Sequence, residues 1–446
     1  GGAIALMTST RTTFSDQNRR INYFFSKYAF ARDEHNRRYS LGDAIRLAKC
    51  SLITTTNGSL QDMSENKLNY ALLGDPALIV GNTDYNMVID EVNGISTAGK
   101  EDITLKAGAR VSVKGHVTTL DGTQASDFTG VMHATVFDNI EIVNCRNNAG
   151  SASQPFSFRE RTKTLFIGGD SVRDGEFTFT FRVPMDINYS LKSGLINLYA
   201  VSDAHDREAK GMFNQFLLGG TADGLVNDSL GPKVELYLNS PDFVSGDQVN
   251  ETPHLLVMLE DPDGINTVGN GIGHDLIAII DGEASLTYNL NNYYTSELGD
   301  YTRGTVSYRL PELSEGMHTL MFRAWDMMNN ATTVTVDFEV VKGLRPRILE
   351  VTTTHSPARE HTTFMLTHDR PETEVTVKFE VFDFSGRTLW TLTEQATTPD
   401  NHYTADWGLC TSAGQPLASG VYLYRVTVTS ASGKSTSRAK KLTILR

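Results

Sequence analysis

The sequence predicts a multidomain, mainly β protein, in which the C-terminal part of an α/β domain is followed by β-sandwich or immunoglobulin-like modules in series. Two observations lead to this fold class. Residues 1–82 combine strand-like apolar runs with the patterns of amphipathic helices. From about residue 86 onward, apolar and polar residues alternate, and Gly, Asn and Asp interrupt the alternation at short intervals. Strands that are joined by tight turns have this pattern.

The bulk composition excludes two classes of protein. The 53 acidic and 40 basic residues give a formal net charge of -13 and are scattered without a basic stripe. This distribution excludes a nucleic-acid-binding protein. The longest apolar runs, such as residues 276–280, are far shorter than the ~20 residues that a membrane-spanning helix requires. The second excluded class is therefore a protein that crosses a membrane by helices.

The first part of the chain is expected to fold in the order strand, helix, helix, strand. The helical stretches have apolar residues three and four positions apart, which gives each helix one buried face. Pro76 follows Gly and Asp and cannot continue a helix, so it marks a turn before the last strand. The expected elements are a strand at 2–8, a helix capped by Ser15 or Asp16, a helix over 41–51, and a strand over 77–80.

The remainder of the sequence is expected to form three β-domains. Alternating runs such as residues 109–117 and 176–183 are typical of strands with one buried face. Gly231-Pro232 marks a boundary between two such regions. The expected domains are 1–85 for the α/β part, 86–229 and 230–343 for two β-sandwich domains, and 344–446 for an immunoglobulin-like domain.

The three cysteines do not indicate a site. Cys50, Cys145 and Cys410 fall in three expected domains, and none belongs to a CxxC pair, so neither a disulfide framework nor a zinc site is predicted. A cysteine nucleophile needs a nearby histidine or a helix N-terminus to stabilise its thiolate. Cys50 lies at the end of a helix with only His35 near it in sequence, and a buried structural cysteine is the more usual interpretation.

One segment concentrates carboxylates and amides and has two interpretations. Calcium prefers six to eight oxygen ligands, so the segment could hold a structural Ca²⁺ ion. A turn-rich hairpin linker, with Asp263-Gly264 and Asn270-Gly271 at the turns, explains the same residues and is favoured. The candidate ligands are Glu260, Asp261, Asp263, Asn266, Asn270 and Asp275.

Three stretches of the sequence resemble known families. The strand ending at residues 7–10, the two helices and the closing residues 72–78 resemble the end of a gingipain-type cysteine peptidase domain, which has a caspase-like fold. Residues 260–275 are similar to a segment of the sortase branch of that family, which serves type IX secretion. The last hundred residues resemble a type IX C-terminal domain, through residues 382–387, Trp407 and residues 414–422.

The resemblance implies a cell-surface cysteine endopeptidase. Such a sortase removes the C-terminal sorting domains of type IX secretion cargo and links the cargo to anionic lipopolysaccharide. The implied partners are the outer-membrane barrel PorV, other proteins of the type IX attachment complex, the cargo C-terminal domains and the lipopolysaccharide. The implied location is the cell surface of a Bacteroidetes-type bacterium, in association with the outer membrane, and no cofactor is implied.

The resemblance also bears on the site residues. The catalytic His and Cys of the family lie at the ends of the two strands before the one that opens this chain, so the dyad is expected upstream of Gly1 and the chain alone is expected to be inactive. Phe14 is the candidate substrate-binding residue, because in the family the loop after this strand lines the specificity pocket and carries an aromatic residue. Alternatively, Phe14 packs as a staple onto the helix that follows.

Two other functions are compatible with the sequence. The first is a secreted gingipain-like protease whose C-terminal domain is a sorting signal, in which case the mature protein would lose the residues after about 345. The second is a non-enzymatic multidomain surface adhesin or scaffold. A scaffold would lack His and Cys at the ends of the two preceding strands, so upstream sequence distinguishes it from a peptidase.

Overall fold

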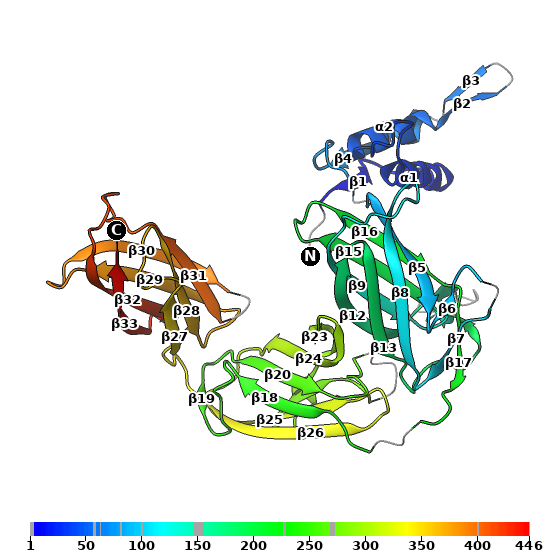
Figure 1. The fold of residues 1–446 in the computed structure, drawn as a ribbon. Coiled ribbons are helices and arrows are strands. Elements are labelled where there is room, and N and C mark those ends of the chain that lie inside the picture. Colours follow the sequence, from blue (N-terminus) through cyan, green and yellow to red (C-terminus); the bar gives the residue numbers. More distant parts are fainter. Residues whose placement is uncertain are drawn as a thin grey trace. The chain divides into compact units, whose positions relative to one another are not determined.

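The computed structural model describes residues 4–56, 59–62, 64–80, 83–99, 101–146, 156–225, 229–267, 273–398 and 401–445. The chain divides into two compact units, Gly1–Asn86 and Met87–Arg446. Helices occur in the first unit, and the second is built from strands and short 3-10 turns (Figure 1). The structure therefore confirms the expected fold class, a multidomain and mainly β protein with an α/β segment at its start.

The first unit packs two helices on a small sheet. Strand β1 pairs antiparallel with β4, so that Leu6 lies opposite Leu73, while Ile21 of the first helix and Ala48 of the second are buried beside Tyr70. A short hairpin and a third helix, which the sequence analysis did not predict, precede β4 (Figure 1). The elements are β1 (Leu6–Ser9), α1 (Ser15–Ala29), α2 (Leu41–Cys50), β2 (Ile53–Thr56), β3 (Ser59–Asp62), α3 (Ser64–Asn69) and β4 (Tyr70–Leu73).

Two local expectations for this unit were wrong. Helix α1 begins one residue earlier than expected, with Phe14 at the N-cap position and no side-chain cap, while Asp16 lies in the first turn, where it favours the helix dipole. The strand expected over 77–80 does not form, and the strand lies before the turn instead, as β4. The carbonyl groups of Pro76 and Leu78 accept hydrogen bonds from the first amides of α2 at 2.9 and 2.8 Å, so this segment caps a helix and is not paired in a sheet.

The second unit begins with an eight-stranded sheet in the order β16-β15-β9-β12-β13-β8-β5-β6. An additional pairing of β16 with β5 closes this sheet, which makes the domain more barrel-like than the expected sandwich. Gly211 of β16 permits the closure, because a Cβ there would lie 2.3 Å from the carbonyl oxygen of Met87. The strands are β5 (Tyr85–Val92), β6 (Ile95–Ser96), β8 (Arg110–Thr119), β9 (Gly130–Phe137), β12 (Thr164–Arg173), β13 (Glu176–Arg182), β15 (Leu195–Ser202) and β16 (Glu208–Phe213).

Two smaller sheets accompany the barrel-like sheet. One has three strands in the order β14-β17-β7, and the other is a two-stranded hairpin. Alternate residues of the barrel strands point inward, as the sequence pattern predicts, so that Val111 and Val113 of β8 are buried. The strands of the smaller sheets are β7 (Thr104–Ala107), β14 (Lys192–Ser193), β17 (Leu217–Thr221), and β10 (Glu141–Asn144) with β11 (Ser157–Glu160).

The third domain is a sandwich of two sheets. Their inner faces share one core, to which Val257 and Val306 contribute from one sheet and Leu320, Phe322 and Phe338 from the other. One sheet contains β18 (Lys233–Leu238), β20 (His254–Glu260), β24 (Asp300–Arg309) and β23 (Tyr294–Glu297). The other contains β19 (Gln248–Val249), β26 (Ala331–Val340), β25 (Gly316–Trp325), β21 (Ile277–Ile280) and β22 (Thr287–Asn289), and the 3-10 turns are η1 (Ala284–Leu286) and η2 (Asn291–Tyr293).

The terminal module is a second sandwich with an aromatic core. The ring centroid of the buried Phe364 lies 5.2 Å from that of Phe379, 5.8 Å from that of Trp407 and 5.1 Å from that of Tyr424. These aromatic residues therefore stabilise the module itself. The strands are β27 (Ile348–Thr353), β28 (Thr362–His368) and β31 (His402–Trp407) in one sheet, and β30 (Thr388–Thr397), β29 (Glu374–Phe382), β32 (Gly420–Ser430) and β33 (Ser435–Ile444) in the other.

Candidate functional site

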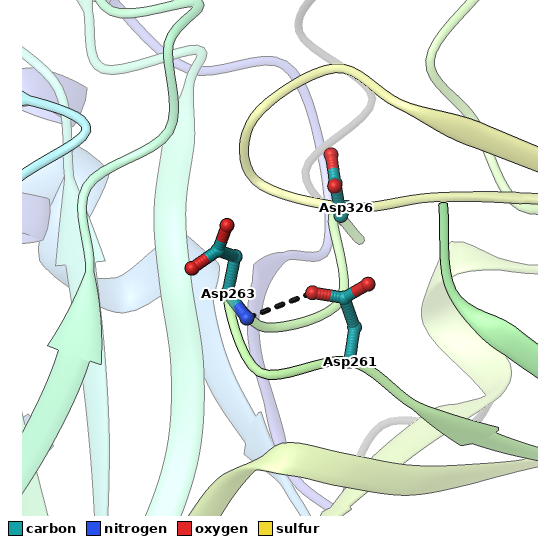
Figure 2. A group of neighbouring side chains, drawn as sticks. All are labelled: Asp261, Asp263 and Asp326. Carbon is teal, nitrogen blue, oxygen red and sulfur yellow. Dashed lines mark hydrogen bonds between the residues drawn. The ribbon is translucent and has the colours of Figure 1, made fainter. Parts of the chain in front are cut away.

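Three carboxylates converge in the third domain. Asp261 and Asp263 lie in the loop after β20, and Asp326 directly follows β25 (Figure 2). One carboxylate oxygen of each residue lies within 4.8 Å of the others. The two segments meet because Asn266 N donates to the carbonyl of Trp325 at 2.8 Å and Met327 N donates to that of Gly264 at 3.1 Å.

The carboxylate of Asp326 closes its own turn. Its oxygens accept hydrogen bonds from Met328 N at 2.9 Å, from Asn330 N at 2.7 Å and from Asn330 Nδ2 at 2.8 Å. The side chain is 0% exposed, and burial, with a contribution from Asp263, raises the pKa of Asp326. Asp33 and Asp383 hold turns of the same kind, since each accepts from the backbone amides two and four residues later. The structure thus explains Asp326 first as a turn-forming residue.

The other two carboxylates are also engaged. Asp261 is 3% exposed, and its Oδ1 accepts a hydrogen bond from Asp263 N at 2.7 Å (Figure 2). Asp263 Oδ1 forms an ion pair with Arg182 Nη2 at 2.7 Å, and Arg182 Nη1 also donates to the carbonyl of Gly108 at 3.1 Å. Because Arg182 is the last residue of β13, the barrel-like domain supplies the positive charge that compensates the acidic cluster.

The cluster lies at a polar junction between the barrel-like domain and the third domain. The segment after β13 contacts the turn that Asp326 closes, since Met185 N donates to the carbonyl of Met327 at 3.1 Å. Asp186 binds two residues of the third domain, His274 Nδ1 at 2.5 Å and Asn329 Nδ2 at 3.0 Å. The Asp261, Asp263 and Asp326 cluster is therefore part of the contact between two domains.

The structure gathers few of the calcium ligands that the sequence analysis proposed. Of the candidate carboxylates, Asp261 and Asp263 join the cluster, whereas Glu260 pairs with Arg303 at 2.5 Å and Asp275 accepts from Asn291. Asn266 is buried, and its backbone amide binds the carbonyl of Trp325 beside Asp326, whereas Asn270 lies outside the described residues. The turn interpretation is confirmed at Gly264, whose φ of 91° favours glycine, whereas Asn270-Gly271 also lies outside the described residues.

Sequence reasoning missed Asp326, which lies far along the chain from the acidic segment. Three carboxylates with hard oxygen atoms could contribute to a calcium site. Arg182 and the amides of the turns already contact these carboxylates, and they account for the cluster without a cation. The calcium interpretation stays a prediction.

The cysteines show no nucleophile arrangement among the described residues. Cys50 is the last residue of α2 and is exposed, so the expectation that it is a buried structural cysteine was wrong. Cys145 is also exposed, while Cys410 is partly buried with its Sγ 3.2 Å from the carbonyl of Gly408. Within the described ranges, no hydrogen bond joins any of the three thiols to an imidazole.

Phe14 lies at the end of the loop between β1 and α1, at the N-cap position of the helix. Its side chain is 60% exposed. The pocket role of Phe14 remains a prediction. In the part of the chain that the structure describes, none of the helices has the length and apolar character required to span a membrane.

Comparison with known proteins finds an informative relative. Residues 1–81 match peptidase family C25. The chain is 32% identical to dimeric latent PorU from Porphyromonas gingivalis, covering 99% of this chain and 41% of that chain, with a TM-score of 0.42. It therefore spans about two fifths of the length of that PorU chain. No curated protein sequence matches.

Two further solved structures are similar only at a low level. A tetra-tandem repeat from the extending region of a large adhesion protein is 14% identical, with 81% of this chain and 74% of that chain covered and a TM-score of 0.17. The Bacteroides ovatus protein SGBP-B, in complex with a mixed-linkage heptasaccharide, is 12% identical, with 82% and 71% covered and a TM-score of 0.24. The sequence identity to PorU along nearly all of this chain, together with the family match over residues 1–81, identifies it as a PorU-like protein of the gingipain-type C25 peptidase family.

Proposed function

We propose that this chain is the C-terminal region of a cell-surface cysteine endopeptidase, a sortase that removes C-terminal sorting domains from type IX secretion cargo and links the cargo to anionic lipopolysaccharide. The observation that carries the proposal is the 32% identity to PorU over 99% of this chain. In this proposal the first unit is the back of the peptidase domain, the next two domains are spacers, and the terminal module docks to the outer-membrane barrel PorV.

The first unit supports a peptidase domain that is completed by preceding residues. Among the described residues, β1 pairs only with β4, so its second edge can accept a further strand. We place the catalytic His and Cys on strands upstream of Gly1, because in the C25 family the dyad lies at the ends of the two strands before the one that corresponds to β1. The match to peptidase family C25 favours this function over an adhesin.

A labelling experiment tests the proposal. The 446-residue chain is incubated with a thiol-directed peptidase inhibitor and with peptide substrates, beside a longer protein that includes the upstream residues. We expect the longer protein to be labelled stoichiometrically and to turn over substrate, and the chain alone to do neither. Turnover by the chain alone would place the nucleophile within these residues and contradict the proposal.

The role of Phe14 has its own test in the longer protein. Replacing Phe14 by Ala should raise KM and leave kcat nearly unchanged if the ring binds substrate in the ground state and the transition state alike. Phe30, at the other end of α1 and similarly exposed, provides the control Phe30→Ala. Equal effects of the two substitutions would assign Phe14 to helix packing.

The C-terminus of the mature protein distinguishes the sortase from a secreted gingipain-like protease. A sortase that docks through its terminal module should keep Arg446, whereas a cargo protease should lose the residues after about 345. Mass spectrometry of the protein isolated from the cell surface measures this difference directly.

A further inference from the structure

The junction between the third domain and the terminal module contains a buried histidine. His254 is the first residue of β20 and is 5% exposed. Its Nε2 lies 2.8 Å from Ser307 Oγ, whereas its Nδ1 is buried and has no hydrogen-bond partner. The carboxylate of Glu372 in the terminal module lies 3.9 Å from Nδ1, which is too long for a hydrogen bond.

The turn that carries Glu372 contacts the third domain directly. Arg309, the last residue of β24, donates from Nη1 to the carbonyl oxygen of Glu372 at 3.2 Å. Beside this contact, Asn401 Nδ2 lies 3.5 Å from the carbonyl oxygen of Asn239. The residues that precede β29 therefore cover the side of His254 on which Nδ1 lies.

Protonation of His254 adds a positive charge and a hydrogen-bond donor to this buried site. A neutral imidazole can satisfy Ser307 through Nε2 and leave Nδ1 facing the turn. An imidazolium carries an N–H on both nitrogens and a full charge, and a buried charge without a hydrogen-bond acceptor is costly. In the imidazolium, the N–H on Nδ1 has no acceptor within hydrogen-bond distance.

The charged groups that face His254 act in opposite directions. Burial lowers the pKa of His254, the Glu372 carboxylate raises it, and the Arg309 guanidinium lowers it, with burial as the largest effect and a lower pKa as the net result. Glu372 is partly solvated, since its side chain is 42% exposed, which weakens its attraction for an imidazolium. A group with a lower pKa in the closed junction binds its proton more tightly when the junction is open, so acid favours opening.

We propose that this junction is released by acid. Protonation of His254 weakens the contact of Glu372 with the start of β20 and with Arg309, and frees the terminal module to move relative to the third domain. The proposal does not depend on the peptidase function, since it concerns only the β-domains.

Hydrogen–deuterium exchange of the 446-residue chain between pH 8 and pH 5 tests the proposal. Exchange rates are corrected for the intrinsic effect of pH and compared for the peptides that cover residues 252–256 and 369–374. We expect opening at both peptides to increase about fivefold on acidification, equivalent to about 1 kcal/mol where 1.4 kcal/mol is a factor of ten. The variant His254→Gln, which keeps a polar group near Ser307 but does not titrate, should lose this response.

Three further variants separate the proposed cause from others. Glu372→Gln removes the attraction for the imidazolium and should enlarge the acid response, whereas Glu374→Gln, at an exposed position two residues away, should leave it unchanged. His133→Gln, at an exposed histidine of β9, should also have no effect. Exchange that is independent of pH, that slows on acidification, or that still accelerates in His254→Gln would overturn the proposal.

Discussion

The ion pair between Arg182 and Asp263 gives a prediction whose sign follows from the neighbouring carboxylates. The two side chains are only 20% and 14% exposed, and their charged atoms are 2.7 Å apart. Replacing Arg182 by Met leaves three negatively charged groups together without their counter-charge, so we expect a loss of about 2–3 kcal/mol in the stability of the third domain. Asp263→Asn also breaks the ion pair, but it relieves the repulsion that Asp263 exerts on Asp326. We therefore expect a smaller loss of stability in the third domain, about 1 kcal/mol.

Native-state hydrogen exchange of the β25 amides measures both effects, because these amides open only when the third domain unfolds in this region. The measurements are made with a chelator, so that a bound cation cannot replace the lost guanidinium charge. Arg303→Met is the matched control, since Arg303 and Glu260 form an exposed ion pair, which contributes little to stability. A larger loss in Asp263→Asn than in Arg182→Met would refute the reasoning.

The same assay tests the calcium interpretation. If the cluster of Asp261, Asp263 and Asp326 binds Ca²⁺ in the folded state only, adding calcium at about a hundred times its dissociation constant should stabilise the third domain by about 2.7 kcal/mol. Asp326→Ala should remove this increment, in addition to the stability that it loses by opening its turn. Equal stability with calcium and with chelator would reject a calcium site.

Three further predictions concern buried groups. Phe364→Ala should destabilise the terminal module by about 3–5 kcal/mol in urea unfolding, whereas Phe384→Ala, at a 70% exposed position, should change stability by less than about 0.5 kcal/mol. Tyr294→Phe should leave the Tm of the third domain unchanged or raise it, because the hydroxyl is buried without a hydrogen-bond partner, and a fall in Tm would reveal a partner. Burial raises the pKa of Asp138, so its ionisation costs stability and the Tm of the barrel-like domain should fall as pH rises through that pKa; thermal scans of Asp138→Asn should show a smaller slope.

Local rules predicted strands such as β8 and β13 correctly. In β8, Val111 and Val113 alternate with polar residues, and these valines are buried as the period of two requires. The Asp263-Gly264 turn was also predictable, because a positive φ favours glycine. By contrast, residues 77–80 have the composition of a strand but cap α2 with their carbonyl groups, and this use depends on a helix more than twenty residues earlier in the chain.

The candidate site was only half predictable. The acidic segment was found from composition, yet Asp326 lies in the sequence pattern of an ordinary turn, and only the pairing of the two loops brings it to Asp261 and Asp263. Arg182 was not foreseen either, because its ion pair joins two domains. Contacts between segments far apart in sequence depend on packing, which periodicity does not encode.

The sequence by itself determined the class of fold, since alternation and turn residues act over a few positions, and through resemblance it determined the family. Only the tertiary structure decided that β16 pairs with β5 to close the barrel-like sheet, and that His254 is buried next to a turn of the terminal module. The physical reason is the same in both cases. Strand formation depends on neighbours along the chain, whereas sheet closure and burial depend on which surfaces meet in space.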